Sequence, residues 1–439
     1  MGPSANGSVP RVAIVLPGGG ARGAYEAGAL SALLPALEAR GERITILCGT
    51  SVGAINAAMF GSLAGAPAQD QVAASLERWR GMRKGDVMRP VVGPGLPITV
   101  LRAIGDVLEV PGVHLAGMLD PAPLRDSLER WVDWLNLHRN VRQREIEAVC
   151  IVATSLSRGG PVAFVETRGQ APRSRSADPL RYVRVLLSGE HVRASAAIPM
   201  LFPPVEVKTP ARAAGHYIDG GTRLNSPIAP ALALGADRVI VIGFEPFAGR
   251  ADLAGRKGPP RLADVAANIL DGLLVDQVAD DLHRLAAINS FLVDAIDGGP
   301  SASARAYRTS RGRSAYRKIG YALVAPEQRG ELGRLAEEVF ERRYGGWKGL
   351  LRPDYPLLSR LLGGARTPSR GELLSFLLFD EAYVEALIEA GRRDAQRWLD
   401  RHPRFWCTDA AHDLEIEADH LAAARETAAI DEWRALRRR

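Results

Sequence analysis

Short, continuously apolar segments alternate with segments of helical spacing along the first 246 residues of this chain. A strand that is apolar along its whole length is typical of a parallel or mixed sheet whose two faces are both covered. The pattern therefore predicts an α/β core with a mostly parallel sheet. The expected strands are Arg11–Leu16, Ile44–Cys48, Val149–Ala153, Val162–Glu166 and Val239–Gly243.

After residue 246 the apolar residues recur every three or four positions, as on the buried face of a helix. We therefore predict an α/β domain over residues 11–246 and a mostly helical region over 247–439 that packs on it. Residues 318–325 are expected to return one more strand to the sheet. The helical spacing runs through 262–289, 331–345, 371–400 and 410–438.

Ser51 stands between the second expected strand and a segment of small residues with helical spacing, Ala54–Phe60. Its neighbours, Gly49-Thr50-Ser51-Val52-Gly53, form the pattern G-x-S-x-G in the strand–turn–helix context of a nucleophile elbow. A sharp turn tolerates only very small neighbours, which gives Gly49 and Gly53 a steric role. We interpret Ser51 as a candidate nucleophile, with an ordinary Gly- and Ser-rich turn as the alternative.

A glycine-rich loop, Pro17-Gly18-Gly19-Gly20-Ala21-Arg22-Gly23, follows the first expected strand. Glycines leave backbone N–H groups unshielded, and a helix begins just after them, so the loop can cradle an anion. The anion is either a phosphate or the oxyanion that develops during acyl transfer. Arg22 either adds a positive charge to this cradle or braces the loop.

The same loop also matches the dinucleotide pattern G-x-G-x-x-G through Gly18, Gly20 and Gly23. That fingerprint requires an Asp or Glu about 20 residues further on, at the end of the second strand. The second strand here ends in Cys48-Gly49-Thr50, and Glu42 precedes it at the wrong end. The dinucleotide interpretation is therefore the weaker one.

Asp219 ends a short apolar approach and is followed by Gly220 and Gly221. Glycines beside a carboxylate allow another group to approach it closely. Asp-Gly-Gly alone is a common turn. Beside a candidate serine nucleophile and an anion cradle, Asp219 becomes a candidate general base.

These residues together resemble the signatures of the patatin-like phospholipase family, which are G-G-G-x-R/K-G, G-x-S-x-G and D-G-G/A. Gly18–Gly23, Gly49–Gly53 and Asp219–Gly221 match them in that order. Ala194–Pro204 is similar to the segment ahead of the family's catalytic Asp. Glu372–Asp380 looks like a segment of long bacterial members.

The resemblance implies a three-layer α/β/α catalytic domain that hydrolyses lipid esters through a Ser51–Asp219 dyad, without histidine. It assigns the oxyanion site to the Gly18–Gly20 loop, to which we add the Val52 N–H and Arg22 as candidates. Histidine order agrees with a dyad, because an α/β-hydrolase places its histidine after the acid. The histidines that follow Asp219 lie in helical segments remote from it: His283, His402, His412 and His420.

Composition adds few constraints. The 439 residues are 46% hydrophobic and 24% charged, as in ordinary globular proteins. The three cysteines, Cys48, Cys150 and Cys407, lack metal-ligand spacing, so we expect no metal and no cofactor. A disulfide framework is also absent, which favours a reducing compartment. No signal peptide or membrane-spanning run is evident, so we expect a cytoplasmic protein, with peripheral membrane contact as an option.

The net charge of +6 rests almost wholly on arginine, since only five of the 56 basic residues are lysine. A dense basic run over residues 305–318 is either a solvated loop or a patch for anionic lipid headgroups. We expect no nucleic-acid partner, because no recognition motif accompanies the run. The oligomeric state is not predicted.

The apolar stretch Gly371–Asp400 bears on the substrate. A helix that is apolar around most of its circumference is usually buried. The alternative is a hydrophobic wall or lid beside the acyl channel, or a membrane-facing surface.

The sequence thus predicts a serine acyl hydrolase acting on a lipid ester, with a glycerophospholipid as the expected substrate. Two alternatives stay open at this point. One is an acylglycerol or thioester hydrolase, and the other is a noncatalytic lipid- or nucleotide-binding protein on the same scaffold.

Overall fold

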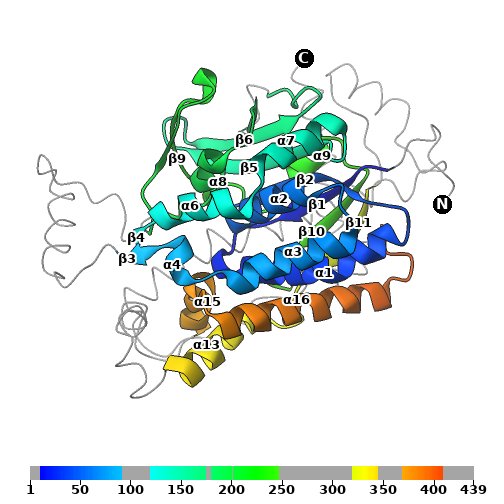
Figure 1. Ribbon diagram of the computed structural model, residues 1–439, viewed down its shortest axis with the longest axis vertical. Helices are drawn as coiled ribbons and strands as arrows, with labels where there is room; N and C mark the ends of the chain where they lie inside the picture. Colours follow the sequence, from blue (N-terminus) through cyan, green and yellow to red (C-terminus); the bar gives the residue numbers. More distant parts are fainter. Residues whose placement is uncertain are drawn as a thin grey trace, which may run out of the picture.

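A mostly parallel sheet forms the centre of the computed structural model, which describes residues 10–90, 119–174, 179–199, 201–246, 319–344 and 368–408 (Figure 1). Nine strands of the described ranges belong to it. Seven of them follow the order β11 (Gly320–Val324), β10 (Arg238–Ile242), β1 (Val12–Leu16), β2 (Ile44–Thr50), β5 (Ala148–Ser155), β6 (Gly160–Thr167) and β7 (Arg181–Arg184). The other two are β9 (Gly215–Asp219), which pairs with β5, and β8 (Val205–Val207), which pairs with β9.

The strands β11, β10, β1, β2 and β5 run parallel, so their carboxyl ends share one edge of the sheet. Leu16 lies opposite Gly49, and Thr50 lies opposite Val152. Strand β9 runs antiparallel to β5 and brings Asp219 opposite Ala153. The register therefore places the ends of β1, β2 and β9 at the same edge.

Helices flank the sheet, which confirms the predicted α/β/α class. The helices α1 (Gly23–Glu38), α3 (Ala68–Gly81) and α16 (Glu381–Arg401) lie side by side in the lower part of Figure 1. Helix α2 (Val52–Leu63) packs against β2 and β5, and α9 (Ile228–Ala233) packs against β1, β2 and β10. The strands β1 and β5 are buried throughout, as expected for strands covered on both faces.

The shorter elements complete the described chain. Helix α8 (Gly189–Ser195) packs against β5 and β9 beside the site edge. The remaining elements are η1 (Gly20–Arg22), α4 (Lys84–Val87), β3 (Arg89–Pro90), β4 (Leu119–Asp120), α6 (Ala122–Trp131), α7 (Trp134–Gln143), η2 (Ala211–Ala213), η3 (Gly220–Thr222), α13 (Glu331–Tyr344) and α15 (Pro368–Leu377).

The stretch 371–400, which we predicted as one helical pattern, forms two helices, α15 and α16. The break has a local cause: the Asp380 side chain caps α16 by accepting a hydrogen bond from Ala382 N at 3.0 Å. Asp380 also accepts a hydrogen bond from the Tyr344 hydroxyl at 2.5 Å. The capped end therefore tethers α15 and α16 to α13. The helical patterns predicted at 262–289 and 410–438 and the basic run at 305–318 lie outside the described residues.

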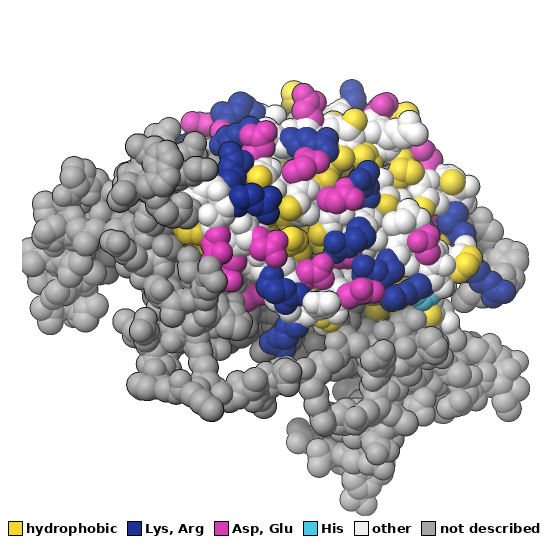
Figure 2. Space-filling view, turned by 90° about the horizontal axis from the view of Figure 1, so that it is seen from below, with side chains coloured by type: hydrophobic (Ala, Val, Ile, Leu, Met, Phe, Trp, Pro, Cys, Tyr) yellow, Lys and Arg dark blue, Asp and Glu magenta, His cyan; other side chains and the backbone are white. Residues whose placement is uncertain are grey.

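The face seen from below mixes positive and negative side chains (Figure 2). Helix α16 contributes exposed ion pairs of this kind, including Arg80–Glu385 and Arg393–Glu331. Surface pairs of this type stabilise a protein only slightly, by about 0–1 kcal/mol each. Within the described ranges, no helix is both long enough and apolar enough to cross a membrane.

Candidate active site

Ser51 occupies a strained turn between β2 and α2. Its φ of 54° and ψ of −120° lie in a region that residues other than glycine rarely adopt. A Cβ on Gly49 would lie 2.1 Å from Gly53 O, and a Cβ on Gly53 would lie 2.0 Å from Leu16 O. Both positions therefore require glycine, and the strand–turn–helix geometry is that of a nucleophile elbow.

Ser195, at the end of α8, holds the elbow through hydrogen bonds. The Ser51 N–H donates to Ser195 Oγ at 2.8 Å, and Ser195 Oγ donates to Val152 O at 2.6 Å. This buried relay ties the strained residue to β5. The sequence predicts the family resemblance of the segment around Ser195 but no role for this residue. A lone serine carries no signal of a backbone partner 144 positions away.

Asp219 lies at the end of β9 with its carboxyl group fully buried. Its Oδ1 accepts a hydrogen bond from Gly221 N at 2.7 Å. Its Oδ2 is buried and accepts no hydrogen bond from any described residue. A Cβ on Gly220 would lie 2.2 Å from Val152 O and 2.9 Å from Thr50 Cγ2. Glycine after Asp219 thus allows β9 to approach the β2 and β5 backbones closely.

Burial raises the pKa of Asp219 from 3.8 to about 7, and the Ser51 hydroxyl and the Gly221 amide oppose this rise. The Ser51 hydroxyl thus favours the ionised form of Asp219, although Oδ2 accepts no hydrogen bond from it. A carboxyl group with a pKa near 7, next to a serine hydroxyl, is able to accept the hydroxyl proton and return it.

The glycine loop lies directly beside Ser51, since a Cβ on Gly18 would lie 2.9 Å from Ser51 Cβ. The Gly18 N–H, one of the predicted oxyanion donors, already donates to Asn225 Oδ1 at 2.9 Å. The N–H groups of Gly19, Gly20 and Val52 donate to no other described residue. Of the predicted amide donors, these three therefore remain available.

Asn225 is a residue of this edge that the sequence analysis did not single out. It follows the Asp219 turn and fixes the first residue of the glycine loop through its side chain. Thr50 holds the residue before Asn225, because the Thr50 Oγ1 donates a hydrogen bond to Leu224 O at 3.1 Å. The one available signal was the position of Asn225 six residues after Asp219, before a Ser-Pro turn.

The Arg22 side chain contacts helix α15. Its Nε donates to Ser375 Oγ at 2.7 Å, and its Nη2 pairs with the Glu372 carboxylate. The guanidinium also lies over the Phe376 ring, 4.3 Å from its centroid. Of the two roles considered for Arg22, bracing the loop fits these contacts, and they give it no contact with the amides of the loop.

A small apolar cavity of about 40 Å³ adjoins Ser51. Its walls come from α2, α3, α6, the segment after α8, and α15. The α15 segment is thus buried, as its apolar pattern predicted, and it also lines this cavity. Lining residues include Gly20, Ser51, Ile55, Trp79, Met88, Leu124, Ile198, Phe202, Phe376, Leu377 and Phe379.

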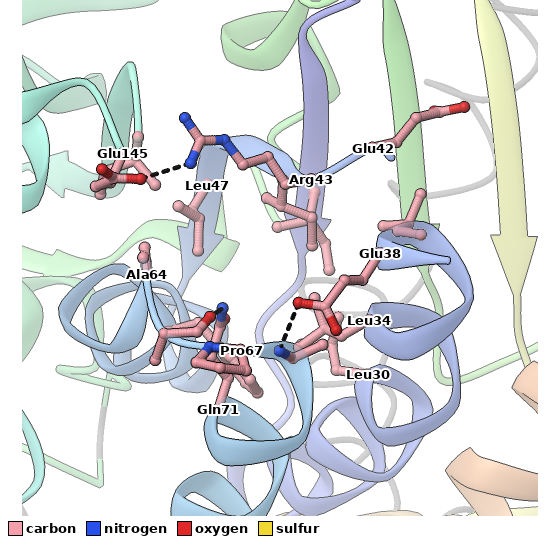
Figure 3. Close-up of a pocket in the computed structure, with 18 of the residues that line it drawn as sticks. Leu30, Leu34, Glu38, Glu42, Arg43, Leu47, Ala64, Pro67, Gln71 and Glu145 are labelled. Carbon is pink, nitrogen blue, oxygen red and sulfur yellow. Dashed lines mark hydrogen bonds and ion pairs between the residues drawn. The ribbon is translucent and has the colours of Figure 1, made fainter. Parts of the chain in front are cut away.

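A larger pocket of about 530 Å³ opens at the opposite, amino-terminal edge of the strands (Figure 3). Leu30, Leu34 and Leu47 form part of its apolar floor. At its rim Arg43 pairs with Glu145 at 2.5 Å. No group of three or more His, Cys, Asp and Glu side chains in the described part of the chain is arranged to hold a metal ion.

Residues 14–232 match the patatin-like phospholipase family, whose members are generally lipid acyl hydrolases. Through these residues the chain belongs to that family, as the signatures predicted. None of the curated proteins compared with the chain matches it.

Two solved structures are similar to the chain at low identity. VipD from Legionella pneumophila is 14% identical, with 90% of this chain and 67% of VipD covered and a TM-score of 0.33. ExoU, in the ExoU–SpcU complex of the type III secretion system of Pseudomonas aeruginosa, is 19% identical, with 96% and 75% covered and a TM-score of 0.24. These TM-scores are too low for either structure to bear on the geometry of this site.

Proposed function

We propose that this protein is a serine acyl hydrolase that cleaves lipid esters through Ser51 and Asp219. The observation that carries the proposal is the buried Asp219 carboxyl, with one oxygen unpaired and its pKa near 7, next to a serine on a strained elbow. Strain and an unsatisfied buried group both destabilise the fold, and such features are concentrated at functional sites.

The reaction proceeds in two halves. Ser51 Oγ attacks the ester carbonyl carbon while Asp219 takes the hydroxyl proton, and the N–H groups of Gly19, Gly20 and Val52 stabilise the oxyanion. The C–O bond to the alcohol then breaks, and Asp219 returns the proton to the leaving alcohol. Asp219 next takes a proton from water, whose oxygen attacks the acyl carbon. The bond from the acyl carbon to Ser51 Oγ then breaks, Asp219 returns the proton to Ser51 Oγ, and the fatty acid is released.

The apolar cavity supports an acyl chain as the group beside Ser51. Its walls are almost entirely hydrophobic, so a hydrocarbon chain gains about 0.8 kcal/mol for each CH₂ that it buries there. At about 40 Å³ the cavity is smaller than typical ligand pockets of about 300–1,000 Å³, so the lining side chains must shift to admit a chain. We favour a glycerophospholipid substrate; an acylglycerol or a thioester would use the same chemistry.

The nucleotide-binding alternative has less support. The strand β2 ends in Thr50, so no acid stands where a ribose would require one. Glu42, at the other end of β2, is engaged by Arg238 at 2.6 Å and by Trp406 Nε1 at 2.8 Å. A noncatalytic lipid binder would have no use for the unpaired Asp219 oxygen.

Labelling with a fluorophosphonate ester, followed by mapping of the modified residue, tests the proposal. We expect label on Ser51 in the wild type and none in Ser51→Ala, which should also lose at least about 10⁴-fold in ester hydrolysis. Ser62→Ala, in the helix that follows Ser51, is the matched control, because the Ser62 hydroxyl donates to Met59 O in its own helix. Hydrolysis retained by pure, folded Ser51→Ala protein would contradict the assignment.

A further inference from the structure

Arg22 is a fully buried cation whose side-chain contacts come mainly from one helix far along the chain. Ser375 accepts a hydrogen bond from its Nε, Glu372 pairs with its Nη2 through both carboxylate and backbone oxygen, and Phe376 lies under its guanidinium plane. All three residues belong to α15 and are separated from Arg22 by about 350 positions. This clasp joins the amino-terminal glycine loop to the carboxyl-terminal helices.

The clasp is coupled directly to the backbone of the glycine loop. Arg22 ends the turn η1, and its own N–H donates to Gly19 O at 3.1 Å. Gly20 has a φ of 58°, and a Cβ there would lie 2.2 Å from Phe376 O. Since the α15 backbone touches Gly20 and the α15 side chains hold Arg22, a shift of α15 must move the amides of Gly19 and Gly20.

Electrostatics make Glu372 the decisive partner. A buried guanidinium without a paired charge is strongly unfavourable, whereas a paired and hydrogen-bonded one is tolerated. A second acid, Glu245, also acts on Arg22, but burial and the Glu372 charge raise the pKa of Glu245 to about 7. Glu372 is the acid whose carboxylate pairs directly with the Arg22 guanidinium.

We propose that Glu372, acting through Arg22, is a positioning residue that holds the Gly19 and Gly20 amides in line with the oxyanion. This inference rests on the proposed acyl hydrolase function and deepens it. It also gives a purpose to the Glu372–Asp380 segment that the sequence marked but did not explain. The amino-terminal α/β domain would then lack a properly placed oxyanion site without α15.

The test compares Glu372→Gln with Glu385→Gln. Glutamine keeps the shape of Glu372 but removes its charge. Glu385 provides the matched control, because its ion pair with Arg80 also connects the amino-terminal part to a carboxyl-terminal helix but is half exposed. We expect kcat to fall about 10²-fold in Glu372→Gln, as for a displacement of about 1 Å at a reacting centre, with KM changed less than threefold. Glu385→Gln should retain wild-type kcat.

A second readout separates positioning from a general loss of structure. A trifluoromethyl ketone with a long alkyl chain adds to Ser51 and creates an oxyanion, whereas the corresponding fatty acid binds without one. Affinity for the ketone should fall in parallel with kcat in Glu372→Gln, while affinity for the fatty acid stays within threefold. Equal losses for both ligands would overturn the proposal, as would a folded Glu372→Gln protein with the kcat of the control.

Ser375→Ala decides the matter if Glu372→Gln does not fold. It removes the hydrogen bond from Arg22 Nε and the one that Ser375 Oγ donates to Glu372 O, but it keeps the ion pair between Arg22 and Glu372. We expect kcat and ketone affinity to fall roughly threefold to tenfold together. Unchanged values in Ser375→Ala would overturn the proposal. A wild-type protein without Ser51-dependent turnover would instead contradict the proposed function itself, and this inference with it.

Discussion

The two cavities at opposite edges of the sheet differ in size and also in the state of their polar groups. The larger one, shown in Figure 3, has its rim groups satisfied: Arg43 pairs with Glu145, and Glu38 Oε1 accepts a hydrogen bond from Ala68 N at 3.0 Å. The smaller one adjoins Ser51 in a strained conformation and, next to it, an unpaired oxygen of Asp219. Stored strain and an unmet hydrogen bond, rather than volume, therefore distinguish the candidate catalytic edge.

The contrast follows from the parallel sheet. Carboxyl ends of parallel strands expose backbone N–H groups of the following helices at one edge, which suits anionic intermediates. At the amino-terminal edge, loops such as 64–68 only reverse the chain, and their backbone groups bond to the side chains of Glu38 and Gln71. Five experiments test how far this contrast holds.

The largest effect is expected from Asp219→Asn, which removes the carboxylate that accepts the serine proton. We expect kcat to fall by about 10⁴-fold, the upper end for a general base. Asp400→Asn, an exposed residue on α16, is the matched control. Near-normal turnover in Asp219→Asn, together with loss of turnover on substitution of a histidine, would replace the dyad by a triad.

The same variant should be more stable than the wild type at alkaline pH. Folding raises the pKa of Asp219 above its ordinary value, so the contribution of its neutral form is complete below about pH 4 and is lost as the pH rises through about 7. Asparagine stays neutral, so urea unfolding at pH 8 should show a gain of roughly 1–4 kcal/mol that vanishes near pH 4. An equal difference at both pH values would argue against a buried carboxylate.

Gly19→Ala tests the donor loop. Its new Cβ would lie 2.3 Å from the Phe244 ring, so the loop must move and displace its amides. We expect kcat to fall by about 10² to 10³-fold with a small change in KM, because the donors act mainly in the transition state. Gly81→Ala, where the Cβ would meet nothing within 4 Å, is the control. Saturable micromolar binding of NAD or ATP in calorimetry, with turnover unchanged in Gly19→Ala, would favour a phosphate cradle instead.

A smaller effect is expected in the pH dependence of kcat/KM, measured per pH unit. Because Asp219 must be ionised to accept a proton, kcat/KM should fall about tenfold for each pH unit below a midpoint near 7. Glu245 also has a pKa raised to about 7 by burial, so the profile of Glu245→Gln identifies the titrating group. A midpoint that persists in Glu245→Gln supports Asp219, whereas one that disappears transfers the titration to Glu245.

The smallest effect is expected from filling the larger pocket. Ala64→Leu places an apolar side chain at its wall, far from the carboxyl ends of the strands. Turnover of a lipid ester should stay within twofold of the wild type. A tenfold change with unaltered thermal stability would show that this edge communicates with Ser51, and would break the contrast drawn above.

Much of the site was predictable because its chemistry lies in local motifs. The elbow around Ser51 depends on glycines four positions apart, and the turn after Asp219 depends on adjacent glycines, so both patterns are visible along the chain. The buried strands were visible for a similar reason, since burial on both faces makes every residue apolar. The α/β class and the family followed from these local signals.

The long-range contacts were decided only by the tertiary structure. Ser195, Asn225 and Glu372 act on Ser51, Gly18 and Arg22 across 144, 207 and 350 positions. A single polar residue in a sequence does not indicate which distant backbone or charge it will meet, because the strand register and helix packing fix that partner. The closeness of Phe376 to Gly20 and the raised pKa of Asp219 have the same origin. Each depends on which groups folding buries away from water, and that burial depends on the whole tertiary structure.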